Sequence, residues 1–153
     1  MSLQDRNKQI VAEYYREYWT LGNPNIVDKL CAEDFVINYP IHGRRQGREA
    51  AKQMLLEFKR AFPNISFHSY GPYPLIADQD YVVVRWIGGG KHTGEEYHNP
   101  PSSALNQPNT DREMYFTGTT IYTLRDGLIV QEVGEESGLN AMHQLGLIPP
   151  ERA

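Results

Sequence analysis

The spacing of hydrophobic positions changes along the chain from a helical period to a strand period. Residues 4–21 and 48–61 carry apolar side chains at three- and four-residue intervals, which predicts helices with one buried face. Asn23-Pro24 predicts the start of a shorter helix, and residues 34–39 alternate as a strand. The first helix has two adjacent rows, Ile10, Tyr14 and Tyr18 beside Val11, Tyr15 and Trp19.

Strand patterns dominate the second half of the chain. Residues 65–77 are interrupted by Pro72 and Pro74, which is typical of a sheet edge or a bulge. Residues 81–92 form an apolar strand that runs into three consecutive glycines. Glycines within a strand favour a bulge or a tight bend, so we expect this strand to curl the sheet around a cavity.

A long hairpin follows, with strands at 114–124 and 128–136. Asp126-Gly127 lies between them, and Gly readily adopts the positive φ that a two-residue hairpin turn needs. Ser137 can cap a short helix that places Leu139, Met142 and Leu145 on one face and ends at Gly146.

The order of these elements predicts the α+β class. Helices gather early and strands late, which favours a curved antiparallel or mixed sheet with helices packed on its concave face. The length of 153 residues indicates one domain, 1–153. Two segments are expected to be irregular, a basic loop at 41–47 and a long polar loop at 95–111.

Composition narrows the partners. The net charge is −4 without a large basic cluster, which argues against a nucleic-acid role. No apolar run approaches the length of a membrane span, so no membrane association is expected. The polar N-terminus and the single cysteine, Cys31, predict a cytoplasmic protein. Ten tyrosines and two tryptophans suit a cleft that binds a small apolar or aromatic ligand.

Several short motifs occur in an order that resembles the SnoaL-like polyketide cyclases of the nuclear-transport-factor-2-like (NTF2-like) superfamily. They are Ala61-Phe62-Pro63-Asn64-Ile65, Val84-Arg85-Trp86, Gly90-Lys91-His92-Thr93-Gly94, Phe116-Thr117-Gly118, the 125–130 stretch and Gln144-Leu145-Gly146-Leu147. The resemblance implies a cone-shaped α+β barrel, a homodimer and a deep apolar pocket. It also implies cofactor-free ring closure with an Asp as acid and base.

The sequence departs from the family at the position of that Asp. Ser137 stands there, while Val133 and Glu132 replace the family's Trp and His. Glu135 is a replacement candidate for the catalytic base, because a dry pocket raises a carboxylate pKa toward neutrality. Strand alternation puts Glu135 on the face of Ser137 and Glu136 on the other face, and a bulge at Gly134 or at the strand end would reverse this. The alternatives for Glu135 are a solvated acid or a partner of Arg85.

Further candidates come from the histidines and aromatic residues. His92 is the second candidate catalytic residue, as a donor to a developing enolate oxygen or as a proton relay; a loop histidine bonded to backbone is the alternative. Pocket-lining or substrate-binding residues are expected among the following side chains: Tyr15, Tyr18, Trp19, His42, Arg85, Trp86, Phe116, Glu132, Glu136 and Ser137. Core packing would explain the aromatic members equally well.

Neither a metal nor a cofactor is expected. No closely spaced set of His and carboxylate ligands is present, and the glycine run does not open a helix as a phosphate loop would. Three functions stay open: a cyclase, isomerase or lyase acting on an apolar carbonyl compound, a ligand-binding protein without chemistry, and a dimerisation domain.

Overall fold

The computed structural model describes residues 1–97 and 106–148 and has the α+β architecture that the sequence predicts. The helical elements are α1 (Leu3–Tyr15), the π-helical turn η1 (Arg16–Thr20), α2 (Ile26–Leu30), α3 (Arg48–Ala61) and α4 (Gly138–Gln144). The strands are β1 (Cys31–Tyr39), β2 (Gly43–Gln46), β3 (Ser66–Ser69), β4 (Ile76–Asp78), β5 (Tyr81–Lys91), β6 (Glu113–Arg125) and β7 (Leu128–Glu136).

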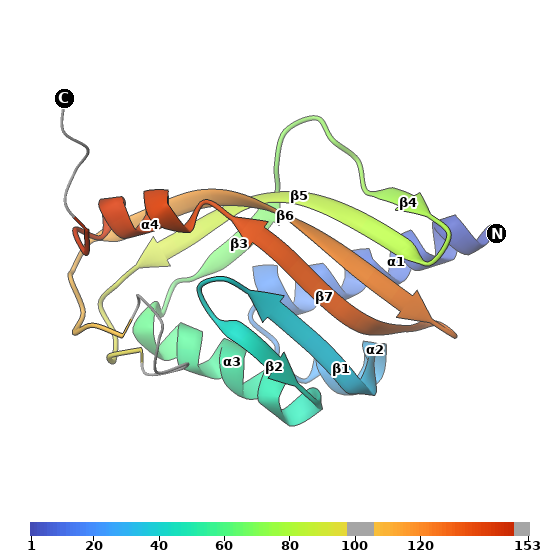
Figure 1. Ribbon diagram of the computed structural model, residues 1–153, viewed down its shortest axis with the longest axis horizontal. Helices are drawn as coiled ribbons and strands as arrows, with labels where there is room; N and C mark the ends of the chain where they lie inside the picture. Colours follow the sequence, from blue (N-terminus) through green and yellow to red (C-terminus); the bar gives the residue numbers. More distant parts are fainter. Residues whose placement is uncertain (98–105, 149–153) are drawn as a thin grey trace.

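The strands form a curved, open mixed sheet. Its order is β2-β1-β7-β6-β5-β3, and β4 pairs with β5 outside this path. Only the pairing of β1 with β7 is parallel among the described strands. The sheet arches over α1 and α3, while α4 follows β7 at one end of the sheet (Figure 1). The aromatic row of α1 and η1 is thereby buried against the inner sheet face.

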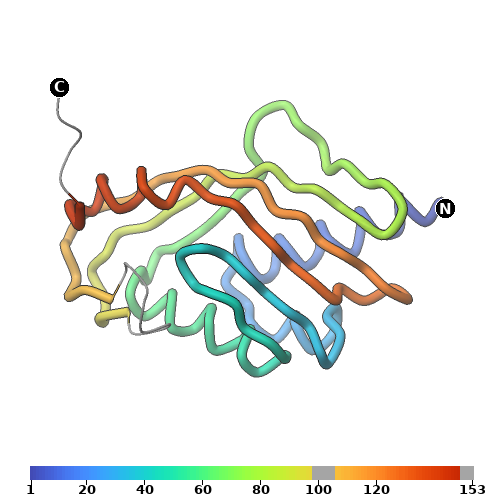
Figure 2. The backbone as a smooth tube through the Cα atoms, viewed as in Figure 1, coloured from blue at the N-terminus to red at the C-terminus, as the bar shows by residue number. Residues whose placement is uncertain are grey.

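Two segments differ from the sequence expectation in their secondary structure. The predicted irregular loop at 41–47 contains β2, which pairs with β1 through backbone hydrogen bonds that hydrophobicity does not encode. The predicted strand at 65–77 is divided into β3 and β4, and the chain between these strands loops away from the sheet (Figure 2). This interval contains Pro72 and Pro74. Residues 98–105 of the expected long loop lie outside the described residues.

One side chain that was predicted to face inward is exposed. Leu139 was expected on the buried face of the last helix, but 64% of its surface is exposed, whereas Met142 and Leu145 are buried. Leu139 lies in the first turn of α4, before the helix packs against β6. Cys31 is buried and is the first residue of β1.

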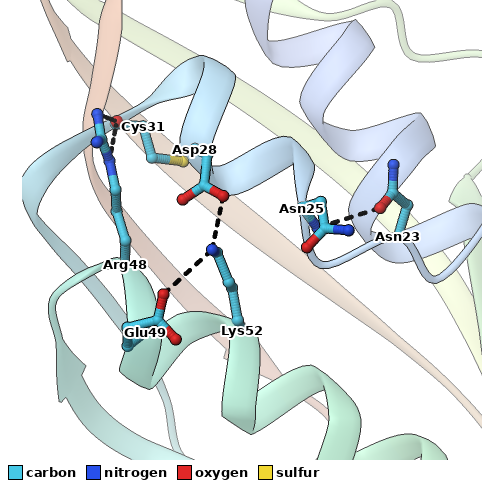
Figure 3. A network of polar contacts seen from close by, with 7 residues as sticks. All are labelled: Asn23, Asn25, Asp28, Cys31, Arg48, Glu49 and Lys52. Atoms are coloured by element: carbon cyan, nitrogen blue, oxygen red, sulfur yellow. Dashed lines mark hydrogen bonds and ion pairs between the residues drawn. The ribbon is translucent and has the colours of Figure 1, made fainter.

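Polar contacts join α2 to α3 at the edge of the sheet (Figure 3). The Arg48 guanidinium donates two hydrogen bonds to the Cys31 carbonyl, of 3.0 and 2.7 Å. Lys52 bridges Asp28 of α2 and Glu49 of α3, at 2.6 and 3.1 Å. Because both carboxylates are largely exposed, these ion pairs position the helices more than they stabilise the fold.

A bulge in the β6–β7 hairpin decides which side chains of β7 face inward. Thr123 pairs with Gln131 and Leu124 with Ile129, so β7 carries one extra residue, Val130. Ile129 is buried, and the extra residue transfers the inward positions from odd to even numbers beyond it. Asp126 and Gly127 of the turn have φ of 52° and 79°, as the predicted hairpin turn requires.

Candidate functional site

Two carboxylates of β7 lie on the inner face of the sheet. After the bulge, Glu132, Gly134 and Glu136 alternate inward, while Glu135 and Ser137 are exposed. Glu136 pairs in register with Gly118 of β6, and Glu132 pairs with Tyr122. The inner face therefore carries one acid deep in the core and one acid near the end of the strand.

Glu132 is fully buried and surrounded by donors. Its Oε1 accepts a hydrogen bond from Tyr14 at 2.6 Å, and its Oε2 accepts from Trp19 Nε1 at 2.7 Å. Tyr39 and Tyr122 also donate to Oε2. Burial raises the pKa of Glu132, and these four hydrogen bonds oppose the rise. With both oxygens occupied, Glu132 holds α1, η1 and the sheet together.

A hydrogen-bonded chain leads away from Glu132 along the inner face. The Tyr39 hydroxyl lies 2.8 Å from Thr120 Oγ1, which accepts from Trp86 Nε1 at 2.9 Å. Two glycines make room for these rings. A Cβ atom at Gly134 would lie 2.0 Å from the Tyr39 ring, and one at Gly118 would lie 2.1 Å from the Trp86 ring.

A hollow opens above this chain, which we call the inner hollow. It is lined by six aromatic side chains and two titratable ones: Tyr15, Trp19, Tyr39, Phe67, Trp86 and Phe116, with His42 and Glu136. Its volume is about 280 Å³ when the open solvent at its mouth is included. The aromatic walls approach closely and leave room at the centre for about one water molecule. Entry of a larger ligand therefore requires wall side chains to move.

Glu136 is the acid of the inner hollow. Its Oε1 accepts a hydrogen bond of 2.7 Å from the backbone N–H of Ile41, and no described side chain donates to its other oxygen. Burial raises the pKa of Glu136 to about 7, opposed by the Ile41 hydrogen bond and reinforced by the charge of Glu135. A carboxyl group with this pKa is divided between its acid and base forms near neutral pH, as proton transfer requires.

His42 lies beside Glu136 in the lining and is held by a tyrosine. Its Nδ1 lies 2.7 Å from the Tyr97 hydroxyl, which also accepts a long hydrogen bond of 3.4 Å from Arg45. Since Arg45 can only donate, we assign the Tyr97 O–H as donor to Nδ1, which places the ring proton on Nε2. Burial, with the charge of Arg45, lowers the pKa of His42 to about 3, so the ring is neutral.

Tyr15 brings an unpaired hydroxyl to the lining. The side chain is 7% exposed, and its hydroxyl has no hydrogen-bond partner among residues 1–97 and 106–148. Burial, reinforced by the charge of Glu132, raises the pKa of Tyr15, so the phenol stays protonated. An unsatisfied buried hydroxyl costs about 1–3 kcal/mol, which a ligand acceptor would recover.

The structure brings many of the expected site residues together. Tyr15, Trp19, His42, Trp86, Phe116 and Glu136 line the inner hollow, and Glu132 lies beneath it through Trp19 and Tyr39. Sequence reasoning missed Tyr39 and Phe67 of the lining, and Tyr97 behind His42. Tyr39 follows Phe35 and Ile37 at two-residue intervals in β1, and all three are buried. This alternation could have identified Tyr39 as an inward-facing residue.

Five expected site residues lie elsewhere. The side chains of Glu135 and Ser137 face solvent, and Ser137 Oγ lies 3.5 Å from Thr117 Oγ1. Arg85 is on the outer sheet face, where it donates to the Gly118 carbonyl and lies over the Tyr70 ring. Tyr18 is buried and donates to the Ala51 carbonyl at 2.7 Å.

His92 is also separate from the inner hollow. Its ring stacks on Phe62 with centroids 4.7 Å apart, and its Nδ1 accepts from the Thr110 N–H at 3.2 Å. Burial lowers the pKa of His92. These contacts place it in the packing between α3 and the end of β5.

Two other kinds of site were sought in residues 1–97 and 106–148. No group of three His, Cys, Asp or Glu side chains in these ranges is close enough to hold a metal ion. None of the helices there combines the length and the apolar character needed to cross a bilayer.

Solved structures with the same fold come from several bacteria. A proposed SnoaL-like polyketide cyclase from Jannaschia sp. CCS1 is 18% identical, with a TM-score of 0.80 and coverage of 98% of this chain and 97% of that one. A proposed polyketide cyclase from Acidithiobacillus ferrooxidans is 25% identical, with a TM-score of 0.74 and coverage of 95% and 98%.

A third solved structure has the same fold. It is a protein with a ketosteroid isomerase-like fold from Catenulispora acidiphila, solved with trimethylamine. The two sequences are 20% identical, the TM-score is 0.71, and the alignment covers 92% of this chain and 94% of the other. The search of curated proteins gave no match.

The sequence itself matches a family model over nearly its whole length. The model describes the SnoaL-like polyketide cyclases and matches residues 9–145, which include the second half of α1, all seven strands and α4. This agrees with the curved α+β sheet and its NTF2-like neighbours. The chain belongs to the SnoaL-like polyketide cyclase family.

Proposed function

We propose that the protein is a cofactor-free enzyme that moves a proton on an apolar carbonyl compound, as a cyclase or an isomerase does. Family membership and fold support a small-molecule role of this type. The observation that carries the proposal is the Glu136 carboxyl group in the lining of the aromatic inner hollow, with a pKa raised to about 7. Glu136 takes the role for which strand alternation alone favoured Glu135.

The proposed step begins with proton transfer from carbon to Glu136. The carboxylate removes a proton from the carbon next to the carbonyl, and the electron pair shifts to the carbonyl oxygen. The unpaired Tyr15 hydroxyl and the Nε2 proton of His42 are neutral donors in the same lining that can stabilise this oxygen. Return of the proton to another carbon gives an isomer. Alternatively, the enolate carbon attacks a second carbonyl of the same molecule and closes a ring, and the alkoxide oxygen that forms takes the proton from Glu136.

Exchange of carbon-bound hydrogen tests the proton transfer without knowledge of the natural substrate. β-Tetralone in deuterated water is a suitable probe, because proton NMR follows the loss of its α-hydrogen signals. Glu136→Gln is expected to lower the protein-catalysed exchange rate by a factor on the order of 100 or more. Glu135→Gln is the matched control, since it alters the neighbouring exposed carboxylate, and it should exchange as the unchanged protein does.

Equal exchange by the two variants would contradict the role of Glu136. Binding without chemistry is the second candidate, favoured by Ser137 in the place of the family's Asp and by the narrow space inside the hollow. Retention of β-tetralone in native mass spectra, with exchange no faster than in buffer, would support it.

The proposal also covers the oligomeric state, the number of domains and the cellular location. We propose a homodimer, supported by large apolar side chains on the outer sheet face such as Tyr81, Tyr115 and Ile121, which are 50%, 52% and 49% exposed. Light scattering measures the mass of the protein in solution and so tests the dimer.

We also propose a single domain, which is supported by one continuous buried core. We propose a cytoplasmic location, which is supported by the single buried cysteine. Limited proteolysis and cell fractionation test them.

A further inference from the structure

A second hollow adjoins the inner hollow at Tyr15. We call it the outer groove, and its volume is about 660 Å³ including open solvent. Three of its residues come from the helix, Ala12, Arg16 and Thr20, and three come from the opposite wall, His68, Ser69 and Leu75. Tyr15 is in the lining of both the outer groove and the inner hollow, so the two hollows adjoin at this residue.

The geometry of the helix explains how Tyr15 comes to line two hollows. Tyr15 and Trp19 form the row that faces the inner hollow, and Ala12, Arg16 and Thr20 form the adjacent row that faces the outer groove. The helix changes to π-helical geometry immediately after Tyr15, in η1. Single π-helical turns within helices occur frequently at functional sites.

The hydroxyl of Tyr15 is the second observation that points to a ligand. Although the side chain is 93% buried, its hydroxyl has no partner in the part of the chain that the structure describes. Tyr14, in contrast, donates to Glu132, and Tyr18 donates to the Ala51 carbonyl. The buried charge of Glu132 and the loss of hydration keep the Tyr15 phenol protonated. A protonated phenol without a partner is a donor ready for an acceptor.

The two compartments differ in chemistry. The inner hollow is aromatic, whereas the outer groove carries a cation at Arg16 and the polar side chains of Thr20, His68 and Ser69. The Arg16 side chain is largely exposed and forms an ion pair of 3.3 Å with its neighbour Glu17. A ligand that fits both is apolar at one end and carries oxygen atoms or a carboxylate at the other.

We propose that Tyr15 is the specificity-determining residue of an elongated site. Its hydroxyl donates to the ligand carbonyl in the inner hollow, and the oxygenated tail of the ligand passes its ring into the outer groove toward Arg16. This inference rests on the proposed function for the carbonyl end and adds the second compartment.

Two ketones and three variants test the inference. The short probe is β-tetralone, and the long probe is β-tetralone extended by an alkyl chain that ends in a carboxylate. Isothermal titration calorimetry measures binding of each. Tyr15→Phe removes the hydroxyl and keeps the ring, Ala12→Phe fills the outer groove, and Gln9→Phe places the same ring at an exposed position of α1 outside the groove.

The variants are expected to separate the two ends of the ligand. Tyr15→Phe should weaken the binding of both ketones by a factor on the order of ten, because the hydrogen bond from the hydroxyl is lost. Ala12→Phe should weaken the long ketone on the order of tenfold and leave the short one unchanged, because only the long one buries methylene groups in the groove. Gln9→Phe should bind both as the unchanged protein does.

Urea unfolding provides a readout that a merely structural role would not reproduce. Tyr15→Phe is expected to unfold at the same or a higher urea concentration, since the hydroxyl that it loses has no protein partner. A clear loss of stability would indicate that the hydroxyl supports the fold and would overturn its assignment to the ligand.

The remaining outcomes distinguish this inference from the proposed function. Exchange that depends on Glu136, together with unchanged binding of both ketones by Tyr15→Phe and Ala12→Phe, would overturn the elongated site and leave the proposed function standing. Failure of both ketones to bind the unchanged protein would overturn both proposals.

Discussion

Glu132 and Glu136 lie on the same face of the same strand, yet their surroundings differ. Both carboxyl groups are in poorly hydrated places, and burial raises the pKa of each. Glu132 accepts hydrogen bonds from four side chains, whereas Glu136 accepts one from the Ile41 backbone. Burial alone therefore does not identify a catalytic acid, and the number of occupied lone pairs separates an anchor from a candidate base.

The difference also explains how the site can keep unused hydrogen-bonding groups while the fold stays stable. The donors of Glu132 come from α1, η1, β1 and β6, so this acid ties the helical layer to the sheet. Glu136 and Tyr15 sit above that tie with unused hydrogen-bonding capacity. The hydrogen bonds of Glu132 therefore stabilise the fold beneath the inner hollow, whereas Glu136 and Tyr15 in its lining can still bind a ligand.

The largest expected effect follows removal of the anchor. Glu132→Ala leaves the hydroxyls of Tyr14, Tyr39 and Tyr122 and the Trp19 N–H without their acceptor. Each unsatisfied buried donor costs about 1–3 kcal/mol, partly relieved by water that enters the space. We expect the free energy of unfolding, measured by urea titration, to fall by about 3–5 kcal/mol.

Glu136→Ala is the control for that measurement, because it removes a single hydrogen bond. It should lower the free energy of unfolding by about 1 kcal/mol or less at neutral pH. Similar losses for the two variants would remove the distinction between anchor and candidate base.

A pH-dependent effect of intermediate size should reveal Glu136. In the unfolded chain its pKa has the ordinary value of 4.5, and in the folded protein it is about 7. Across that range the unfolded chain has released the proton that the folded protein retains, so raising the pH destabilises the fold. The gap corresponds to a loss of up to about 3 kcal/mol from this group.

Glu136→Gln isolates this contribution because glutamine does not titrate. Relative to the unchanged protein, the variant should become progressively more stable as the pH rises from 4.5 to 7. His42 acts in the opposite direction, since its pKa is lowered to about 3, but it is present in both proteins and cancels. A stability difference that is constant with pH would contradict the raised pKa of Glu136.

The smallest effect is expected at the residue shared by the anchor and the hollow. Tyr39→Phe removes one donor to Glu132 and the contact with Thr120 but keeps the ring that lines the inner hollow. Urea unfolding should show a loss of about 1 kcal/mol, with hydrogen exchange of β-tetralone retained. Loss of exchange at unchanged stability would place Tyr39 in the proton-transfer machinery instead.

Local chemistry predicted much of the fold. The Asp126-Gly127 turn, the helix at 48–61 and the long strands are encoded by neighbouring residues, and the structure has all of them. The strand β2 was missed because its basic, glycine-flanked sequence has no apolar alternation, and only pairing with β1 makes it a strand. The division of 65–77 into β3 and β4 was visible in its prolines.

The site was harder to predict, because one extra residue decides it. Alternation counted from buried Ile129 places Glu135 inside, and the Val130 bulge reverses this in favour of Glu132 and Glu136. A bulge arises from register with β6, which the sequence of β7 does not reveal. The partners of Glu132 are equally invisible, since Tyr14 lies 118 positions away along the chain.

The most direct test is a carbon-detected NMR titration of the glutamate carboxyl groups. The resonance that is absent from the Glu136→Gln variant identifies Glu136. It should titrate with a midpoint near pH 7, as burial in the aromatic hollow requires. A midpoint at the ordinary value of 4.5 or below would contradict the assignment of Glu136 as the base.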